Sequence, residues 1–333
     1  MSLPVAVIGA GGWGTALAVI LAKTERCVSL WVHEPELAQS LSQSRENSIY
    51  LPSIRIPDSV RISNSVDEAI AGSRIVIMAV PSHVFRSVLQ EVVPLVQPNT
   101  IFVSATKGIE NQTLMRMSQV LEDSLGSKQA ERIAVISGPT FAPEVARGVP
   151  TALVVASASE SLRLLLQREL SMPRFRLYTN SDTIGVEMGA ATKNIIAIAA
   201  GVADGLGLGS NAVAALVTRG LAEITRLAVA CGGRRETLSG LAGLGDLILT
   251  SYGQLSRNRS VGIALGQGRT IGEITAGMRS VAEGIRTTES TVKLAREHRV
   301  EMPIAERMYS VLYEGLRVND AIQDLMERKL KEE

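Results

Sequence analysis

The sequence predicts an α/β fold followed by an all-helical region, and three observations support this. The chain has 333 residues, which is long for one hydrophobic core and favours two domains. In its first part, short β-branched runs alternate with longer amphipathic segments, the pattern of a doubly wound, mainly parallel sheet. After about residue 180, long patterns rich in Ala, Leu and Gly indicate helices. We therefore expect one domain over residues 1–180 and a second over 181–333.

Each predicted element follows from its local pattern. The strands, which are short and apolar, are Val5–Gly9, Val28–Val32, Ile75–Val80, Ile101–Ala105, Ile133–Ser137, Ala152–Ala156 and Phe175–Tyr178. The helical patterns between them are Gly14–Thr24, Val84–Val93, Leu114–Leu125 and Ser159–Leu170. The helices expected after residue 180 are Ile184–Ala203, Asn211–Ala230, Ile285–Glu297, Ile304–Tyr313 and Asp320–Lys331.

Composition excludes several classes of protein. Lys and Arg (34) nearly balance Asp and Glu (33), which argues against a nucleic-acid-binding or membrane-surface protein. The most apolar stretch, 195–217, is interrupted by Asp204 and Asn211, so it predicts a buried helical hairpin and no membrane insertion. The N-terminus lacks the basic segment of a signal peptide, and we expect a cytoplasmic protein. Cys27 and Cys231 are expected to be buried thiols, and the spacing of cysteines and histidines predicts no metal site.

A glycine-rich turn is the strongest local signal. It contains Gly9, Gly11 and Gly14 in the spacing Gly-x-Gly-x-x-Gly, directly after an apolar strand and directly before a helix. This context is typical of a dinucleotide-binding turn. The first glycine serves the tight turn, the second allows the backbone to approach a pyrophosphate, and the third packs the helix on the strand. The exposed N–H groups at the helix start favour the phosphates of NAD or NADP.

The second strand ends about 20 residues later, where such folds bind the adenosine ribose. Glu34 is placed to accept hydrogen bonds from the ribose hydroxyls of NAD. His33 is placed to stack on adenine or to contact the extra phosphate of NADP, with Arg45 as a more distant candidate. NAD and NADP both remain open. His83 follows a later strand, and we assign it no role.

Several polar residues interrupt apolar surroundings further along the chain. Lys107 and the segment Ser137–Ala142 directly follow sheet strands, which places them at the ligand crevice. Lys193 lies within a helix of Ala, Ile and Thr, and Asp246 stands between Gly245 and Leu247.

Eight segments follow one another in a distinctive order: GAGGWGTALA, VPSHVF, TKGIE, SGPTFAPEVA, ATKNIIAIAAGVADGLGLGSNAVAAL, GLAGLGDLILT, LSRNRSVG and VAEG. In this order they resemble the bacterial NAD(P)-dependent glycerol-3-phosphate dehydrogenase family, from about residue 4 to 320. The resemblance implies an N-terminal Rossmann domain and a helical domain of the 6-phosphogluconate-dehydrogenase type. It also implies reversible hydride transfer between NAD(P)H and dihydroxyacetone phosphate, which supplies glycerol 3-phosphate for phospholipid synthesis, and a homodimer. Gly12 departs from the family, in which many members carry serine.

The chemistry of the residues agrees with this resemblance. Oxidising a secondary alcohol needs a base for the hydroxyl proton, and we expect Lys193 to be that base and the proton donor in reduction. A buried lysine needs a partner, for which Glu187 and Asp246 are the candidates. Burial of an ammonium group lowers its pKa, and Lys107 nearby would act in the same direction. Asp246 would orient Lys193 or accept from a substrate hydroxyl, and Lys107 would polarise the carbonyl.

The remaining expected contacts concern the substrate phosphate and the cofactor. A serine at a helix start, a guanidinium group and an amide form a sound anion site, and Ser256, Arg257 and Asn258 supply them. Gly138 and Thr140 are expected to add donors to the substrate. The cofactor residues expected besides Glu34 and Arg45 are Gly9, Gly11, Gly12, Trp13, Gly14, His33, Lys107, Ala142, Arg257, Val281 and Glu283.

Two alternatives remain. One is a related enzyme of the same plan that acts on another hydroxy acid, as ketopantoate reductase and 6-phosphogluconate dehydrogenase do. The other is a non-catalytic NAD(P)-binding sensor, which would retain the glycine turn and lose the substrate-side residues. Lys107, Lys193, Asp246 and Arg257 are all present, which disfavours the sensor.

Overall fold

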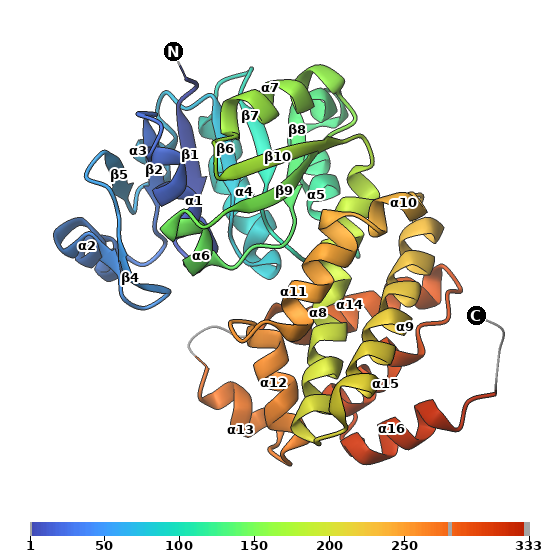
Figure 1. Cartoon of the computed structure of the whole chain (residues 1–333). Coiled ribbons are helices and arrows are strands. Elements are labelled where there is room, and N and C mark those ends of the chain that lie inside the picture. The colour runs from blue at the N-terminus through green and yellow to red at the C-terminus, as the bar shows by residue number, and fades with distance from the viewer. Residues whose placement is uncertain (1, 279–281, 330–333) are drawn as a thin grey trace. The chain divides into compact units, whose positions relative to one another are not determined.

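The computed structural model describes residues 2–278 and 282–329 (Figure 1). The chain divides into two compact units. Unit 1 comprises Met1–Lys107 and Met115–Glu187, and unit 2 comprises Gly108–Leu114 and Met188–Glu333.

Unit 1 is built on an eight-stranded sheet with the strand order β10-β9-β8-β7-β6-β1-β2-β5. Neighbouring strands run parallel except β8 and β9, which are antiparallel. The strands are β1 (Val5–Ile8), β2 (Val28–Trp31), β5 (Val60–Ser63), β6 (Ile75–Met78), β7 (Ile101–Ser104), β8 (Ile133–Ser137), β9 (Thr151–Ala156) and β10 (Phe175–Asn180). The helices are α1 (Gly12–Ala22), α2 (Pro35–Ser44), α3 (Val66–Ile70), α4 (Phe85–Val92), α5 (Met117–Leu125), α6 (Ala142–Arg147) and α7 (Glu160–Leu170), with short 3₁₀ turns η1 (Ser82–Val84), η2 (Val93–Leu95) and η3 (Ser127–Arg132).

Both faces of the sheet are buried, because alternate side chains of each strand point to opposite sides. Val5 and Val7 of β1 belong to one apolar cluster with α1, α6 and α7. Ala6 and Ile8 belong to the other, with α3, α4 and α5. Figure 1 shows helices on the two sides of this sheet. The predicted doubly wound, mainly parallel sheet is confirmed.

Residues 45–63 form structure that the sequence pattern did not indicate. A small antiparallel pair, β3 (Glu46–Asn47) and β4 (Leu51–Arg55), precedes the edge strand β5. In β5 only Val60 and Ser63 are buried, so four residues give no continuous apolar run. The predicted helix Leu114–Leu125 begins only at Met117, because Leu114 has a φ of +58° that a right-handed helix does not accept.

Unit 2 is helical throughout the part of it that the structure describes, as predicted. Its helices are α8 (Thr183–Gly205, whose first turn belongs to unit 1), α9 (Gly209–Ala230), α10 (Arg235–Leu238), the π-helical turn η4 (Leu241–Gly245), α11 (Asp246–Tyr252), α12 (Arg257–Gly266), α13 (Ile271–Ala276), α14 (Glu283–Glu297), α15 (Pro303–Tyr313) and α16 (Val318–Met326). Helix α16 ends before the predicted Lys331, where the charged sequence after Met326 offers no apolar face to pack; Lys331 itself lies outside the described residues.

Helix α8 is the core of unit 2. Within the described residues it alone is long and apolar enough to cross a membrane, yet the whole of its most apolar 18-residue window is buried inside the protein. Together with α9 it forms the predicted helical hairpin. The prediction of buried cysteines was wrong for Cys27, which is exposed just before β2, and Cys231 is only half-buried.

Glycines bring α8 and α12 into backbone contact. A Cβ added to Gly262 would lie 2.0 Å from the carbonyl oxygen of Ile198, and one added to Gly201 would lie 2.2 Å from that of Arg259. Both distances are far below van der Waals contact, so neither position accepts a side chain without moving a helix. This packing fixes α12 against α8, which carries Lys193.

Candidate functional site

The glycine turn lies at the carboxyl end of β1, where the strand order changes direction between β1 and β6. Gly9 has a φ of +115°, and a Cβ there would lie 2.7 Å from the carbonyl oxygen of Ala79. A Cβ on Gly14 would lie 1.9 Å from the carbonyl oxygen of Gly9. Around Gly11, by contrast, no described heavy atom lies within 4 Å of the added Cβ. Turn geometry and close packing therefore require two of these glycines, and the third leaves room for a ligand.

The surroundings of this turn fit a dinucleotide. The Nε1 donor of Trp13 is buried and has no hydrogen-bond partner among the described residues. Ala142, the first residue of α6, lies beside Gly12, with its Cβ 3.8 Å from the position of an added Cβ there. A pyrophosphate would fit this place. It would occupy the open space at Gly11, accept from the N–H groups at the start of α1, and give the buried Trp13 donor a nearby acceptor.

Gly12 has a steric role besides any phosphate contact. A Cβ on Gly12 would lie 2.7 Å from the carbonyl oxygen of Tyr50, which stands just before β4. The absence of a side chain here thus allows the 45–58 segment to lie against the turn.

The residues expected at the adenosine end lie at the carboxyl end of β2. His33 and Glu34 are both exposed, and the His33 ring meets the Trp31 ring edge-on at 5.6 Å between centroids. Arg45 is directed elsewhere: its Nη2 donates to the carbonyl oxygens of Pro57 and Val60, the latter at 2.8 Å. The Arg45 guanidinium therefore holds the turn before β5.

Lys107, Gly138 and Thr140 lie together at the ends of β7 and β8. Lys107 Nζ donates to the Gly138 carbonyl oxygen at 3.2 Å, and Thr140 Oγ1 donates to the same oxygen at 3.3 Å. Gly138 has a φ of +149°, and a Cβ there would lie 2.9 Å from Leu153 Cα. The structure thus groups the three residues that the sequence assigned to substrate contacts in this unit. His83 is exposed, in η1.

In unit 2, Lys193 is buried with two oxygen acceptors. Its Nζ donates to Asp246 Oδ1 and to Thr250 Oγ1, each at 2.6 Å, and the Lys193 and Asp246 side chains are 5% and 1% exposed. Thr250 Oγ1 donates in turn to the Asp246 carbonyl oxygen at 2.7 Å. Of the two predicted partners, Asp246 is correct. Glu187 is not, because its carboxylate bonds Arg116 and Ser118 instead.

The π-helical turn η4 sets the position of Asp246. Gly189, one helical turn before Lys193 on α8, approaches η4 so closely that an added Cβ would lie 2.8 Å from the Ala242 carbonyl oxygen. Asp246 follows as the first residue of α11, and Thr250 lies one turn further on the same face. Single π-turns of this kind are frequent at functional sites.

Ser256 and Asn258 lie at the start of α12, and Asn258 contacts α8. Ser256 caps α12 by accepting from Arg259 N at 3.2 Å, as the sequence predicted. Asn258 Nδ2 donates to Asn194 Oδ1 at 3.0 Å, and Asn258 Oδ1 accepts from Gly284 N at 3.0 Å. Asn194 Nδ2 is buried and unpaired within the described chain.

The three remaining residues that the sequence assigned to the cofactor lie in other parts of the chain. Arg257 is exposed at the start of α12, and Glu283 is the first residue of α14. Val281 lies outside the described residues.

Sequence reasoning missed Thr250, Asn194 and Asn47. Thr250 follows Asp246 by four residues on a helix, a spacing that shares one face and would have identified it. Asn194 stands next to Lys193 in an apolar helix. Asn47 is buried and contacts the glycine turn from 37 residues away.

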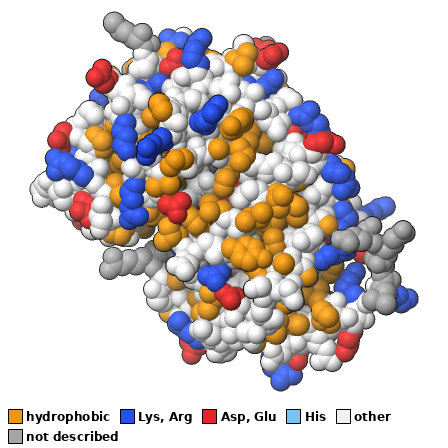
Figure 2. All heavy atoms as spheres, viewed as in Figure 1, with side chains coloured by type: hydrophobic (Ala, Val, Ile, Leu, Met, Phe, Trp, Pro, Cys, Tyr) orange, Lys and Arg blue, Asp and Glu red, His pale blue; other side chains and the backbone are white. Residues whose placement is uncertain are grey.

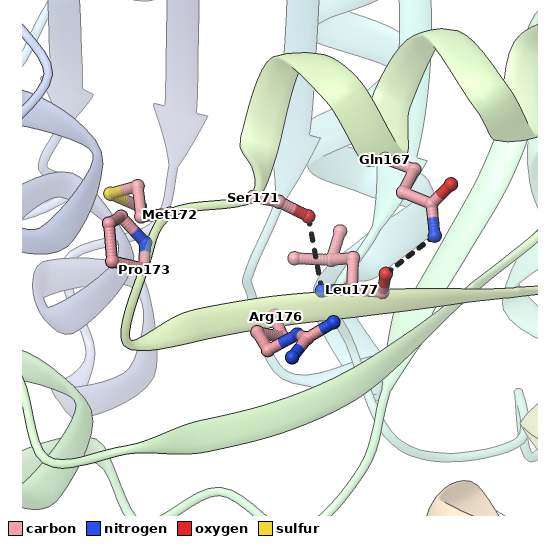
Figure 3. A pocket seen from close by; sticks show the side chains of 6 residues that line it. All are labelled: Gln167, Ser171, Met172, Pro173, Arg176 and Leu177. Atoms are coloured by element: carbon pink, nitrogen blue, oxygen red, sulfur yellow. Dashed lines mark hydrogen bonds between the residues drawn. The ribbon is translucent and has the colours of Figure 1, made fainter.

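A separate open cavity of about 370 Å³ lies beside β10 (Figure 3). The side chains of Ser171 and Gln167 bond the N–H and the carbonyl oxygen of Leu177, at 3.1 and 2.8 Å. Its six lining residues are Gln167, Ser171, Met172, Pro173, Arg176 and Leu177. The predicted site residues are not among them.

Comparisons with known proteins agree across the chain. Residues 4–163 match the family model described as NAD-dependent glycerol-3-phosphate dehydrogenase N-terminus, and residues 182–323 match the corresponding C-terminus. A glycerol-3-phosphate dehydrogenase [NAD(P)+] of Koribacter versatilis is 52% identical over 97% of both chains. Another, of Citrifermentans bemidjiense, is 50% identical over 100% of this chain and 99% of its own.

Solved structures of glycerol-3-phosphate dehydrogenases and of other dehydrogenases resemble this chain over nearly its whole length. A glycerol-3-phosphate dehydrogenase of Coxiella burnetii superposes with a TM-score of 0.93 at 40% identity, covering 98% of this chain and 99% of the other. A ketopantoate reductase of Ralstonia eutropha shares the fold, with a TM-score of 0.63 at 16% identity over 96% of this chain and 100% of the other.

Proposed function

Since the chain belongs to the family of NAD-dependent glycerol-3-phosphate dehydrogenases, we propose that it interconverts dihydroxyacetone phosphate and sn-glycerol 3-phosphate. The observation that carries the proposal is the buried Lys193, held at 2.6 Å by both Asp246 and Thr250. When bound, NADH or NADPH would supply the hydride for reduction, and NAD⁺ or NADP⁺ would accept it in oxidation. The chain's own residues bind the reactants and move the proton.

Lys193 exchanges that proton. In reduction its ammonium group donates a proton to the C2 oxygen of dihydroxyacetone phosphate while hydride arrives at C2. In oxidation neutral Lys193 accepts the hydroxyl proton of glycerol 3-phosphate as hydride leaves C2. Asp246 stabilises the ammonium form, and its bond, with that from Thr250, fixes the direction of Nζ.

The other assigned residues hold the substrate. Lys107 polarises the C2 carbonyl, and Gly138 and Thr140 add donors beside it. Ser256, Arg257 and Asn258 bind the phosphate at the start of α12, where backbone N–H groups and a guanidinium favour an anion.

The cofactor residues are those of the glycine turn with Trp13, His33, Lys107, Ala142, Arg257, Val281 and Glu283. Residues 1–180 form the nucleotide-binding domain and residues 181–333 the substrate-binding domain. The product supplies glycerophospholipid synthesis in the cytoplasm.

The active form is a homodimer. Ile248, Tyr252 and Leu255, on and just after α11, are 46%, 47% and 51% exposed, an apolar surface that a second subunit would cover. Figure 2 shows hydrophobic side chains gathered on the visible face of unit 2.

The test is an activity assay that varies the substrate and the cofactor. Purified protein is mixed with dihydroxyacetone phosphate and either NADH or NADPH, and loss of the reduced-cofactor absorbance is followed. We expect oxidation that requires the phosphorylated ketone and is absent with dihydroxyacetone itself. Oxidation with ketopantoate in place of the phosphorylated ketone would instead support the related hydroxy-acid enzyme.

A further inference from the structure

Asn47 contacts the glycine turn from a segment remote in sequence. It is 0% exposed, at the end of β3. Its Nδ2 donates to the Ala10 carbonyl oxygen at 2.8 Å and to Thr15 Oγ1 at 2.9 Å. Its Oδ1 accepts from Tyr50 N at 3.1 Å. One amide group therefore joins three points: the glycine turn, the first turn of α1, and the start of β4.

The bond to Ala10 determines how the next peptide group is oriented. In a trans peptide the carbonyl oxygen of one residue and the N–H of the next point in opposite directions. Asn47 and Thr15, whose Oγ1 lies 3.3 Å from the same oxygen, hold the Ala10 carbonyl toward the protein interior. The N–H of Gly11 consequently points outward, on the side where a pyrophosphate would approach.

Tyr50 completes the arrangement. Its N–H donates to Asn47 Oδ1. Its carbonyl oxygen would lie only 2.7 Å from a Cβ added to Gly12. The 45–58 segment therefore lies against the turn at Ala10, through Asn47, and at Gly12, through Tyr50. Arg45 anchors the same segment at its other end through the carbonyl of Val60.

We propose that Asn47 is a positioning residue for cofactor binding: by fixing the Ala10–Gly11 peptide, it presents the Gly11 N–H to the pyrophosphate of NADH or NADPH before the cofactor arrives. This inference rests on the proposed function, because it needs a dinucleotide at the turn. Pre-orientation lowers the ordering cost of binding, so its loss raises the dissociation constant of the cofactor.

The experiment compares three proteins: wild type, Asn47→Asp and the control Asn99→Asp. The carboxylate introduced by Asn47→Asp would keep the acceptor for Tyr50 and lose the donors to Ala10 and Thr15. Asn99 is exposed in the same unit and precedes β7 at the amino end of that strand, so it undergoes the same chemical change away from the glycine turn. Cofactor Kd is measured by quenching of tryptophan fluorescence, and KM for cofactor and for dihydroxyacetone phosphate by steady-state kinetics.

For Asn47→Asp we expect cofactor Kd and KM to rise about tenfold or more, with KM for dihydroxyacetone phosphate within about twofold of wild type. Lowering the pH should restore affinity in part, because the introduced carboxyl group, once protonated, again donates to Ala10. Asn99→Asp should match wild type throughout. Should Asn47→Asp fail to fold, Thr15→Val removes one hydroxyl from the same arrangement, and Thr15→Ser should restore binding.

Wild-type cofactor affinity in Asn47→Asp, or in Thr15→Val if that is the variant that folds, overturns the inference. So does an equal loss for cofactor and phosphorylated ketone accompanied by a lowered Tm, which would mark a purely structural residue. A wild-type protein that binds neither NADH nor NADPH refutes the proposed function itself and the inference with it.

Discussion

Lys193 and Asp246 form an ion pair that is almost fully removed from water. Desolvating two charges is costly, and the short bonds to Asp246 and Thr250 are what offset that cost. Removing the ammonium group would take the ion-pair partner at 2.6 Å away from the buried Asp246 carboxylate. A functional variant of Lys193 therefore has to be interpreted together with its effect on folding.

Lys193→Met should lower turnover by at least about 100-fold, because it removes the proton donor, while cofactor Kd stays close to wild type. The variant should also lose roughly 3 to 5 kcal/mol of unfolding free energy, because the buried Asp246 carboxylate loses its ammonium partner. Steady-state kinetics and tryptophan fluorescence test the first point, and urea unfolding tests the second. The double variant Lys193→Met/Asp246→Asn serves as the control, since it should recover stability and remain inactive. Turnover near that of wild type would exclude Lys193 as the proton donor.

At the scale of residues, the sequence predicted most of the polar groups that the structure brings together. Lys107 with Gly138 and Thr140, and Lys193 with Asp246, are both found as pairs or groups. The role of Asn47 could not be predicted from the sequence, because the group that it contacts is a backbone carbonyl, that of Ala10, 37 residues away. Only the fold makes that amide a neighbour of the glycine turn.

The packing of α8 against α12 depends on two glycines that have no side chain. Gly201 and Gly262 face each other's helix, with carbonyl oxygens where side chains would otherwise lie. Gly201 lies within the most apolar stretch of the sequence and Gly262 outside it, and only the packing shows that both are contact positions between the helices.

Gly262→Ala should destabilise the protein by about 3 kcal/mol, because the added Cβ would lie 2.0 Å from the Ile198 carbonyl oxygen. Gly272→Ala is the matched control: it lies exposed in α13, with no described heavy atom within 4 Å of the added Cβ. That change should stabilise by roughly 0.5 to 1 kcal/mol through helix propensity. Urea unfolding measures both, and similar values for the two variants would contradict the packing argument.

The start of α15 depends on a titratable group. Glu223 of α9 accepts from the N–H groups of Ile304 and Ala305, at 2.9 and 3.3 Å, which satisfies two donors at that helix end. Burial raises the pKa of Glu223 from 4.5 to about 7, although the two backbone bonds and Arg226 oppose the shift.

This raised pKa predicts a pH-dependent stability with a definite sign. Between pH 4.5 and about 7 the unfolded chain ionises Glu223 while the folded protein keeps it protonated, so the contribution of this group to stability falls as pH rises through that window. Glu223→Gln cannot ionise. Its unfolding free energy relative to wild type should therefore increase from pH 5 to pH 8 by on the order of 3 kcal/mol. Urea unfolding at several pH values provides the measurement, and a constant difference would contradict the shift.

At the scale of the whole molecule, the sequence predicted the sheet of unit 1 from short apolar runs that alternate with amphipathic segments, and the helices of unit 2 from long patterns rich in Ala, Leu and Gly. What it missed was short or local. Strands β3, β4 and β5 contain few buried residues, and their pairing depends on partners outside their own pattern. The boundary of the N-terminal unit also needs the structure, since residues 108–114 belong to unit 2.

The sheet of unit 1 ends at β10 on one side and at β5 on the other. A strand with only one neighbour offers free backbone groups to any passing extended chain, which is a route to aggregation. Here Ser171 and Gln167 occupy both groups of Leu177, and Met172 exchanges backbone bonds with Phe175. An incoming chain would have to displace all of these bonds before it could pair. The side chains that line the cavity beside β10 therefore protect this edge of the sheet against pairing with a further strand.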